Sequence, residues 1–513
     1  MHGHLASGGD DFYMEIINNL SLGFSVALSL SNLLYCFAGV VLGTLVGVLP
    51  GIGTVTTVAL LLPLTFSLPP ESALIMLSGI YYGAQYGGST TSILVNMPGE
   101  ASSVVTTIDG YQMALQGRAG PALGIAALGS FFGGCVATLL IALFAPILAQ
   151  AALQFDASAY FSLMCFGLVG AVVLAHGSII KSVGMVALGL CLGLVGPDLN
   201  SGTVRYDFGI LELGDGIGFI PVVMGIYGIA EVAYNLEKGS AKKEIFSRVG
   251  RIWPTLSDIK YCIPSMLRGT VLGSALGLLP GGGALLASFA AYTLEKKVAK
   301  PPQQFGRGDI RGVAAPETAN NAGAQTSFIP MLTLGLPSNP TMALMIGALM
   351  IQGIAAGPRV MVDRPGLFWG VVASMWIGNL MLVILNLPLI GIWTKLLQIP
   401  YRMLFPAIVV FSSIGVLAAN NSIVEIYILV FFAVFGYIAL KFGCELAPFV
   451  LAFILGPLME QYLRRAMLIS RGDASVFITE PISLTFLLAS VALLLAIAIP
   501  AIRKGRETAM REE

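Results

Sequence analysis

The sequence predicts an all-α, polytopic integral membrane protein with about 11–13 membrane helices or half-helices. Composition is the first reason: 56% of the 513 residues are apolar, only 11% are charged, and the mean hydropathy is +0.86. A soluble chain of this length needs more charge to cover its surface. The second reason is an internal repeat, because residues 42–53 and 272–283 are identical at seven of twelve positions. The third is an uneven distribution of basic residues, which predicts that the two repeats are inverted.

Each copy of the repeat contains a helix break. Proline removes a backbone donor and glycine admits any φ, so Pro50-Gly51 and Pro280-Gly281 each interrupt an apolar helix. Inside the hydrocarbon layer, broken backbone survives only where protein or a water-filled cavity covers it. We therefore predict that these four residues are the tips of two helical hairpins. Paired breaks of this kind indicate the substrate site of a secondary transporter.

The first repeat is predicted to occupy residues 1–120. Apolar residues recur at helical spacing around Ile16, which is typical of a short amphipathic helix at the membrane interface. The arms of the first hairpin are residues 33–49 and 54–68, and both are shorter than a full membrane span. A separate helix over residues 72–82 is expected to follow.

A polar cluster over residues 83–100 completes this repeat. It is too apolar for a water-exposed loop and too rich in Gly, Ser, Thr and Asn for a lipid-facing helix. We predict a discontinuous helix that presents backbone groups to a ligand, although packing by small residues is an equal alternative for any single Ser or Thr. The candidate substrate-binding residues are Ser89, Thr90, Thr91, Ser92, Asn96, Pro98 and Gly99.

The second repeat is predicted over residues 236–358. It begins with a basic interfacial helix near Phe246 and continues with hairpin arms at 265–279 and 284–298. A second polar cluster and broken helix follow. Its candidate substrate-binding residues are Asn320, Asn321, Thr326, Ser327, Pro337, Ser338 and Asn339. The remaining segments are expected to form a helical frame, namely residues 121–235 and residues 359–513 with a cytoplasmic tail.

Charge predicts the orientation. Residues 1–117 contain no Lys or Arg and six Asp or Glu, whereas the flanks of the second hairpin carry eleven basic residues. Because positive charge marks the cytoplasmic side, the first hairpin opens outward and the second inward. The formal net charge is zero, so no nucleic-acid partner is expected.

The same residues resemble a known family. The sequence is similar to the large membrane subunit of the tripartite tricarboxylate transporters, the TctA type. The motifs that carry the resemblance are residues 43–53, 79–91, 96–100, 109–112, 277–283, 316–321 and 334–337.

The resemblance implies a multi-pass importer of the bacterial inner membrane, driven by a Na⁺ or H⁺ gradient and without a further cofactor. It implies a small membrane subunit (TctB type) and a periplasmic solute-binding protein (TctC type) as partners. The implied substrate is a di- or tricarboxylate, such as a citrate-like acid.

The polar clusters contain no Lys or Arg, so helix N-termini, backbone amides, hydroxyls and amide side chains must meet a carboxylate's charge. Co-bound cations must offset the rest, because a bare multivalent anion in hydrocarbon costs on the order of tens of kcal/mol. Glu100 and Glu317 are candidate proton or cation sites, with helix capping or a loop position as alternatives. The other candidate cation-binding residues are Gly51, Gly53, Gly281, Gly283, Asn96, Thr333 and Gly335.

Two further interpretations stay open. A channel or scaffold subunit without ion coupling would use similar broken helices. A membrane-embedded enzyme would need a catalytic set, and the sequence contains no recognisable one; the six Cys lack metal-ligand spacing as well. For the transporter, we expect an elevator-like shift of each hairpin with its polar cluster against the frame, while a rocking movement fits the repeats equally.

Overall fold

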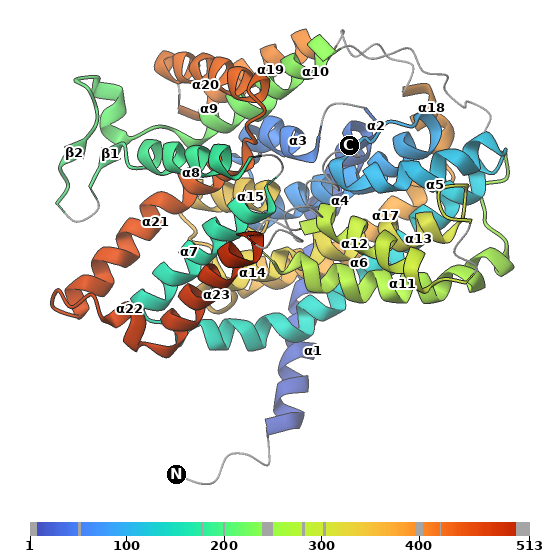
Figure 1. The fold of residues 1–513 in the computed structure, drawn as a ribbon, viewed down its shortest axis with the longest axis horizontal. Coiled ribbons are helices and arrows are strands. Elements are labelled where there is room, and N and C mark those ends of the chain that lie inside the picture. Colours follow the sequence, from blue (N-terminus) through green and yellow to red (C-terminus); the bar gives the residue numbers. More distant parts are fainter. Residues whose placement is uncertain are drawn as a thin grey trace.

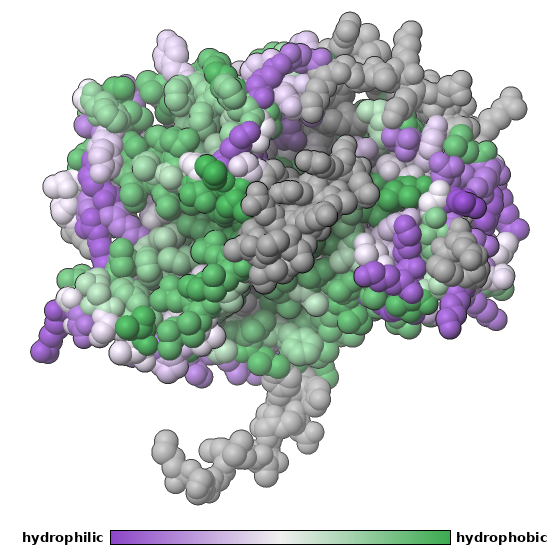
Figure 2. Space-filling view, in the orientation of Figure 1, coloured by the Kyte–Doolittle hydropathy of each residue, from purple (hydrophilic) through white to green (hydrophobic). Residues whose placement is uncertain are grey.

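The computed structural model describes residues 8–49, 53–175, 178–198, 201–238, 250–279, 283–300, 304–396, 404–420 and 422–498. In these ranges the chain is almost wholly helical, and one short antiparallel pair, β1 (Gly196–Pro197) with β2 (Val204–Arg205), is the exception. Five of the described helices are long and apolar enough to cross a membrane, and six shorter apolar helices accompany them. Figure 2 shows a hydrophobic surface across the middle of the molecule, with hydrophilic residues at its left and right ends. The prediction of an all-α membrane protein is confirmed.

Among the described residues, the first predicted repeat contains seven helical elements, among them one long helix. Its elements are α1 (Gly8–Ala27), α2 (Leu30–Val48), α3 (Thr54–Leu61), η1 (Leu62–Thr65), α4 (Pro70–Val95), η2 (Ala101–Ser103) and α5 (Val104–Leu115). Ser29 begins α2 by accepting a hydrogen bond from the N–H of Asn32, and proline at the first position begins α4. In Figure 1, the N-terminal part of α1 projects away from the other helices, whereas Gly23 of α1 packs against Trp369.

A glycine stripe explains why α4 is longer than expected. Gly39, Gly43 and Gly47 of α2 face α4, and a Cβ atom on Gly43 would lie 2.3 Å from the carbonyl oxygen of Ile80. Small residues on both helices therefore allow backbone-to-backbone contact. The segment from residue 83 onward continues α4 without interruption to Val95, so the chain breaks at residues 96–100 and not near Tyr82.

The second repeat has an equivalent stripe of glycines. Its elements are α11 (Leu256–Gly277), α12 (Gly283–Val298), α13 (Arg311–Thr326), α14 (Phe328–Leu334) and α15 (Pro340–Ile351). Gly269, Gly273 and Gly277 of α11 face α13, and a Cβ atom on Gly273 would lie 2.3 Å from the carbonyl oxygen of Ala319. The stripes occupy equivalent positions, 230 residues apart.

The other helices surround these two units. They are α6 (Ala119–Ala152), α7 (Ala157–Leu174), α8 (Ile179–Gly193), η3 (Leu211–Asp215), α9 (Phe219–Val223), the π-helical turn η4 (Met224–Ala230), α10 (Glu231–Lys238), α16 (Arg359–Asp363), α17 (Pro365–Asn386), α18 (Ile390–Leu396), α19 (Leu404–Asn420), α20 (Ile423–Lys441), α21 (Ala447–Ile469), α22 (Val476–Thr479) and α23 (Pro481–Ala498). Figure 1 places α7, α8, α21 and α23 in the left half of the molecule, and α5, α11 and α13 in the right half.

Two equivalent glutamines connect the repeats. Gln116, just after α5, donates from Nε2 to the carbonyl oxygen of Arg307 at 2.7 Å. Gln352, just after α15, donates from Nε2 to the carbonyl oxygens of Thr65 at 3.2 Å and Leu68 at 3.5 Å. The end of each repeat therefore contacts the loop that follows the hairpin of the other repeat.

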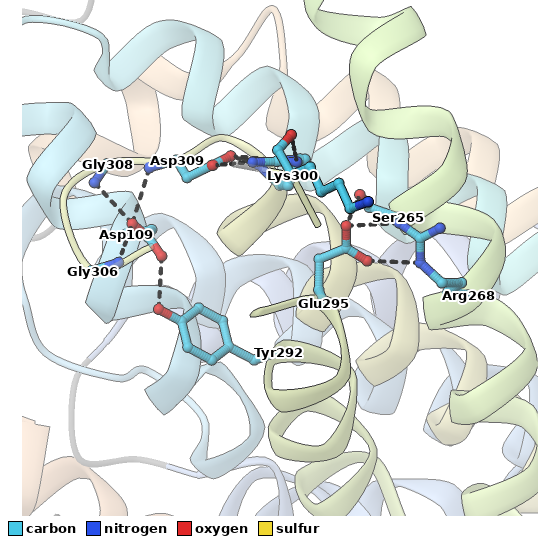
Figure 3. Close-up of polar contacts among 10 residues, drawn as sticks. Asp109, Ser265, Arg268, Tyr292, Glu295, Lys300, Gly306, Gly308 and Asp309 are labelled. Carbon is cyan, nitrogen blue, oxygen red and sulfur yellow. Dashed lines mark hydrogen bonds and ion pairs between the residues drawn. The ribbon is translucent and has the colours of Figure 1, made fainter. Parts of the chain in front are cut away.

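A buried aspartate holds the loop after the second hairpin. Asp109 of α5 accepts hydrogen bonds at Oδ1 from the backbone N–H groups of Gly306, Gly308 and Asp309, at 2.8–2.9 Å. Its Oδ2 accepts one from the hydroxyl of Tyr292 at 2.8 Å (Figure 3). We call this arrangement the Asp109 clamp. It joins α5 of the first repeat to α12 and to the turn before α13.

Ion pairs stabilise the same end of the second repeat. Arg268 of α11 pairs with Glu295 of α12 at 2.7 Å, and Ser265 donates to the same carboxylate (Figure 3). Arg311 pairs with Asp309 at 2.7 Å, and its guanidinium lies 4.5 Å from the ring centre of Tyr261. Arg268 therefore links α11 to α12, and Arg311 links the start of α13 to Tyr261 of α11.

Candidate functional site

A cavity of about 230 Å³ lies where the two repeats meet, and α7 and α21 complete its wall. Four helices of eight residues or more begin at its wall: α3, α12, α15 and α21. Their first N–H groups have no partner within the helix, and side chains accept from one such group in α3 and one in α15. The helix dipoles place partial positive charge at all four ends. The polar side chains at its wall are Tyr81, Gln85, Glu100, Ser102, Asn339, Thr341 and Glu445. Among the described residues at this wall there is no Lys, Arg or His.

Asn339 is one of the predicted residues that line this cavity. Its Oδ1 accepts the N–H of Met342 at 3.0 Å and so caps α15. Its Nδ2 donates to the hydroxyl of Tyr81 at 3.2 Å and to Ser327 Oγ at 3.3 Å. Asn339 therefore links the second polar cluster to α4 of the first repeat.

Glu100 lies beside the start of α3. Its Oε2 accepts hydrogen bonds from both the N–H, at 2.9 Å, and the hydroxyl of Thr54. A carboxylate at a helix N-terminus is electrostatically favourable, so the capping alternative describes Glu100. Glu231 accepts from the Thr56 hydroxyl at 3.0 Å, and a Cβ on Gly53 would lie 3.8 Å from Glu231 and 4.0 Å from Glu100. Two carboxylates thus flank the residue that follows the first hairpin tip.

Glu317 lies elsewhere, in the middle of α13, and is completely buried. Its carboxylate accepts hydrogen bonds from Ser89 of α4 at 2.5 Å, from Thr106 of α5, and from Ser130 of α6 at 3.5 Å. Neither the helix-cap nor the loop alternative describes it. Ser89 and Thr90, predicted as substrate ligands, line a separate small cavity beside Glu317.

The remaining predicted hydroxyls mostly bond to nearby backbone. Thr91 donates to the carbonyl oxygen of Val48, at the end of the first hairpin arm, at 2.8 Å. Ser92 donates to the carbonyl oxygen of Ser103 at 2.9 Å. Thr326 and Thr333 donate to carbonyls four residues earlier in their own helices, and Ser338 lies 3.5 Å from the carbonyl oxygen of Ser327. These contacts match the packing alternative more closely than direct exposure to a ligand.

Each polar helix ends at a residue whose backbone adopts the left-handed helical conformation. Asn96 ends α4 with φ 54°, and Gly335 ends α14 with φ 70°. Gly99 returns against the first hairpin, because a Cβ on it would lie 2.0 Å from the carbonyl oxygen of Gly47. Asn96 and Pro98 are exposed and do not line the cavity. Pro337 is buried and is not among the residues that line it.

The other predicted residues fall into two groups. Gly283 lines the cavity at the start of α12, and Asn320 and Asn321 are fully buried in α13 beside Glu317. The hairpin tips Pro50, Gly51, Pro280 and Gly281 lie outside the described residues, as does Phe246 of the basic interfacial helix.

Sequence reasoning missed Tyr81, Gln85, Glu231 and Glu445. Tyr81, Gln85 and Ser89 recur every four residues, so helical periodicity through the polar cluster was the available signal for the first two. Isolated carboxylates in apolar segments were the signal for Glu231 and Glu445. A larger cavity of about 510 Å³, with Arg359 and Arg465 at its wall, contains none of the predicted residues.

A cavity at which several helices begin, in a protein with five described helices long and apolar enough to cross a membrane, is typical of a membrane transport protein. The sequence profile described as "Tripartite tricarboxylate transporter TctA family" matches residues 33–451, and the chain belongs to that family. This membership makes it a membrane component of a transporter and not a member of an enzyme family.

The relatives are themselves uncharacterised. One is the "Uncharacterized 52.8 kDa protein in TAR-I ttuC' 3'region" of Agrobacterium vitis, 56% identical over 500 residues, which cover 98% of this chain and all of the relative. Another, from the TAR-II ttuC' 3'region of the same organism, is 58% identical over 242 residues, covering 47% of this chain and all of the relative. No solved structure matches the chain.

Proposed function

We propose that this chain is the membrane transport subunit of a cation-coupled importer for di- or tricarboxylates, such as a citrate-like acid. The observation that carries the proposal is the cavity of about 230 Å³ at which four helices begin and whose described wall has no basic side chain. Helix N-termini favour carboxylate oxygens without a fixed cation.

Cation coupling follows from the charges at the same wall. Glu100 and Glu445 line the cavity together with the helix N-termini. Their negative charge opposes a multivalent anion, and partial helix charges amount to only about half an elementary charge each. Protons or Na⁺ ions must therefore enter with the substrate, so substrate moves only when cations neutralise it.

The two repeats are proposed to be inverted. The α4 helix has 26 residues, a length of about 39 Å, and separates the outer end of the first hairpin from Gln116. Gln116 contacts the loop after the second hairpin, and Gln352 contacts the loop after the first. These crossed contacts support hairpins that open toward opposite membrane faces, in agreement with the positive-inside distribution.

An elevator-like movement is proposed for the transport step. The glycine stripes pack each hairpin tightly against its own polar helix, which supports movement of the pair as one body. A Cβ on Gly133 of α6 would lie 2.4 Å from the carbonyl oxygen of Thr318 in α13. We therefore assign α6 to the moving unit, although the sequence had suggested that it belongs to the frame.

The proposed setting is the inner membrane of a bacterium. A TctC-type periplasmic binding protein would deliver the carboxylate, and a TctB-type small membrane subunit would complete the transporter. Family membership supports both partners.

The test is uptake into proteoliposomes that contain this chain with its purified partners. Di- and tricarboxylates are compared under an imposed Na⁺ gradient, an imposed pH gradient, or neither. We expect saturable uptake that requires one of the two gradients and that Glu100→Gln reduces, while Glu71→Gln, in the first turn of α4, serves as a matched control. Downhill flux of equal rate without either gradient would favour the channel interpretation.

A further inference from the structure

A second polar site surrounds Glu317, apart from the carboxylate cavity. Among the described residues, the three side chains that donate hydrogen bonds to its carboxylate are neutral hydroxyls, from α4, α5 and α6. Among the described residues no Lys, Arg or His forms an ion pair with it. Burying an unpaired carboxylate is costly, and hydroxyl donors supply hydrogen bonds but no balancing charge.

A small cavity lies directly against two of these hydroxyls. Its volume of about 10 Å³ suits one particle the size of a water molecule or a bare monovalent ion. Every polar group at its wall carries an oxygen that can bind a cation: Tyr86, Ser89, Thr90, Ser130 and Asn386. Ser89 and Ser130 also contact Glu317 Oε2, so the carboxylate lies immediately behind them.

Unused carbonyl-type oxygens provide an independent observation. Asn386 is only 4% exposed, and its Nδ2 donates to the carbonyl oxygen of Leu382 at 3.0 Å. Its Oδ1 has no hydrogen-bond partner among the described residues, and neither does Oδ1 of the fully buried Asn321. Buried amide oxygens are normally satisfied, so an unpaired oxygen at the wall of a polar cavity indicates a missing ligand.

We infer that this cavity binds one Na⁺ ion, held by the oxygens of Ser89, Thr90, Ser130 and Asn386 and neutralised by Glu317. Hard cations prefer hydroxyl, amide and carboxylate oxygens. A single carboxylate among neutral ligands matches the charge of a monovalent ion better than that of a divalent one. The site joins α4, α6, α13 and α17, so the ion would stabilise the contact between the two repeats.

The inference deepens the proposed function, because it names one coupling cation and its place. Its test does not depend on transport, so the two can fail separately. The melting temperature of the purified protein in detergent is measured as NaCl replaces choline chloride at constant ionic strength. For the wild type we expect a rise of about 2–5 °C that saturates with Na⁺. We expect Glu317→Gln to abolish this rise.

The matched control is Glu295→Gln. Like Glu317, Glu295 is buried, with 1% of its side chain exposed, but it already forms an ion pair with Arg268. This variant should melt at a lower temperature and still respond fully to Na⁺. A full Na⁺ response in Glu317→Gln, or no response in the wild type, would overturn the inference; a shift that follows pH instead of Na⁺ would make Glu317 a proton site and also overturn it.

A second pair of variants keeps the test decisive if Glu317→Gln does not fold. Ser130→Ala removes one neutral ligand and leaves the carboxylate in place. We expect the Na⁺ concentration for half-maximal stabilisation to rise about tenfold. Ser374→Ala, another buried serine that donates to its own helix at 2.7 Å, should leave that concentration unchanged. Equal midpoints in the two variants would contradict the assigned ligands.

Discussion

Replacing Asp109 should release the loop that precedes α13. In Asp109→Ala the N–H groups of Gly308 and Asp309 and the hydroxyl of Tyr292 lose their buried acceptor. An unsatisfied buried donor costs about 1–3 kcal/mol, whereas the N–H of the exposed Gly306 can turn to water. For these three buried donors together, we therefore expect Asp109→Ala to lower the free energy of unfolding by about 3–9 kcal/mol.

Two milder variants divide this effect. Tyr292→Phe removes one hydrogen bond and should cost about 1 kcal/mol. Asp109→Asn keeps an acceptor for the three N–H groups and loses the charge, so its cost should be intermediate, about 1–2 kcal/mol. Thermal unfolding in detergent gives the order of the three variants. Trypsin cleavage at the exposed Arg307 reports local release of the loop.

The reasoning would be refuted by either of two results. Tyr292→Phe could destabilise the protein as much as Asp109→Ala, which would show that the single bond from the Tyr292 hydroxyl matters more than the bonds from the backbone N–H groups. Alternatively, trypsin could cleave Asp109→Ala at Arg307 no faster than the wild type.

Three further predictions concern topology, transport and packing. Single cysteines at Glu71 and Arg307 should be labelled from opposite sides of the membrane by an impermeant reagent; labelling from one side would contradict inverted repeats. Asn321→Ala removes the donor that holds Ser130 at 2.7 Å, so it should impair uptake without preventing membrane insertion, and wild-type uptake would show that the amide only packs. Gly43→Val should destabilise the protein by about 3 kcal/mol or more, because its first carbon would meet a carbonyl oxygen of α4 at 2.3 Å. Gly184→Val, where no atom lies within 4 Å, should melt near the wild-type temperature.

Local patterns predicted the hairpin arms closely. The first arm was expected over residues 33–49, where α2 spans Leu30–Val48. The corresponding arm of the second repeat was expected over 265–279, and α11 there ends at Gly277 but begins already at Leu256. The lengths of the apolar runs and the positions of the Pro-Gly pairs predict where these helices end. The end of α4 was predicted too early, because Gly, Ser and Thr are weak helix formers on their own. Close packing against the glycines of α2 overrides that weak propensity.

The site itself could be predicted only in outline. Polar clusters marked α4 and α13, but the partners of Glu317 lie 228, 211 and 187 residues away in sequence. Their approach depends on how three helices pack, which no local pattern encodes. For the same reason, Asn339 could be recognised as a polar residue after a break, whereas its contact with Tyr81 could not.

The spacing of the two glycine stripes limits how the hairpins can slide. Glycines four residues apart repeat every 6 Å or so along a helix, with bulkier side chains between them. A shift of α2 along α4 by half that distance would drive Val40 or Thr44 into the backbone that now meets glycine. The interface between α2 and α4 therefore favours one register of the two helices. A large displacement of these helices must therefore occur at a different interface, or it must move α2 along α4 in steps of one glycine spacing.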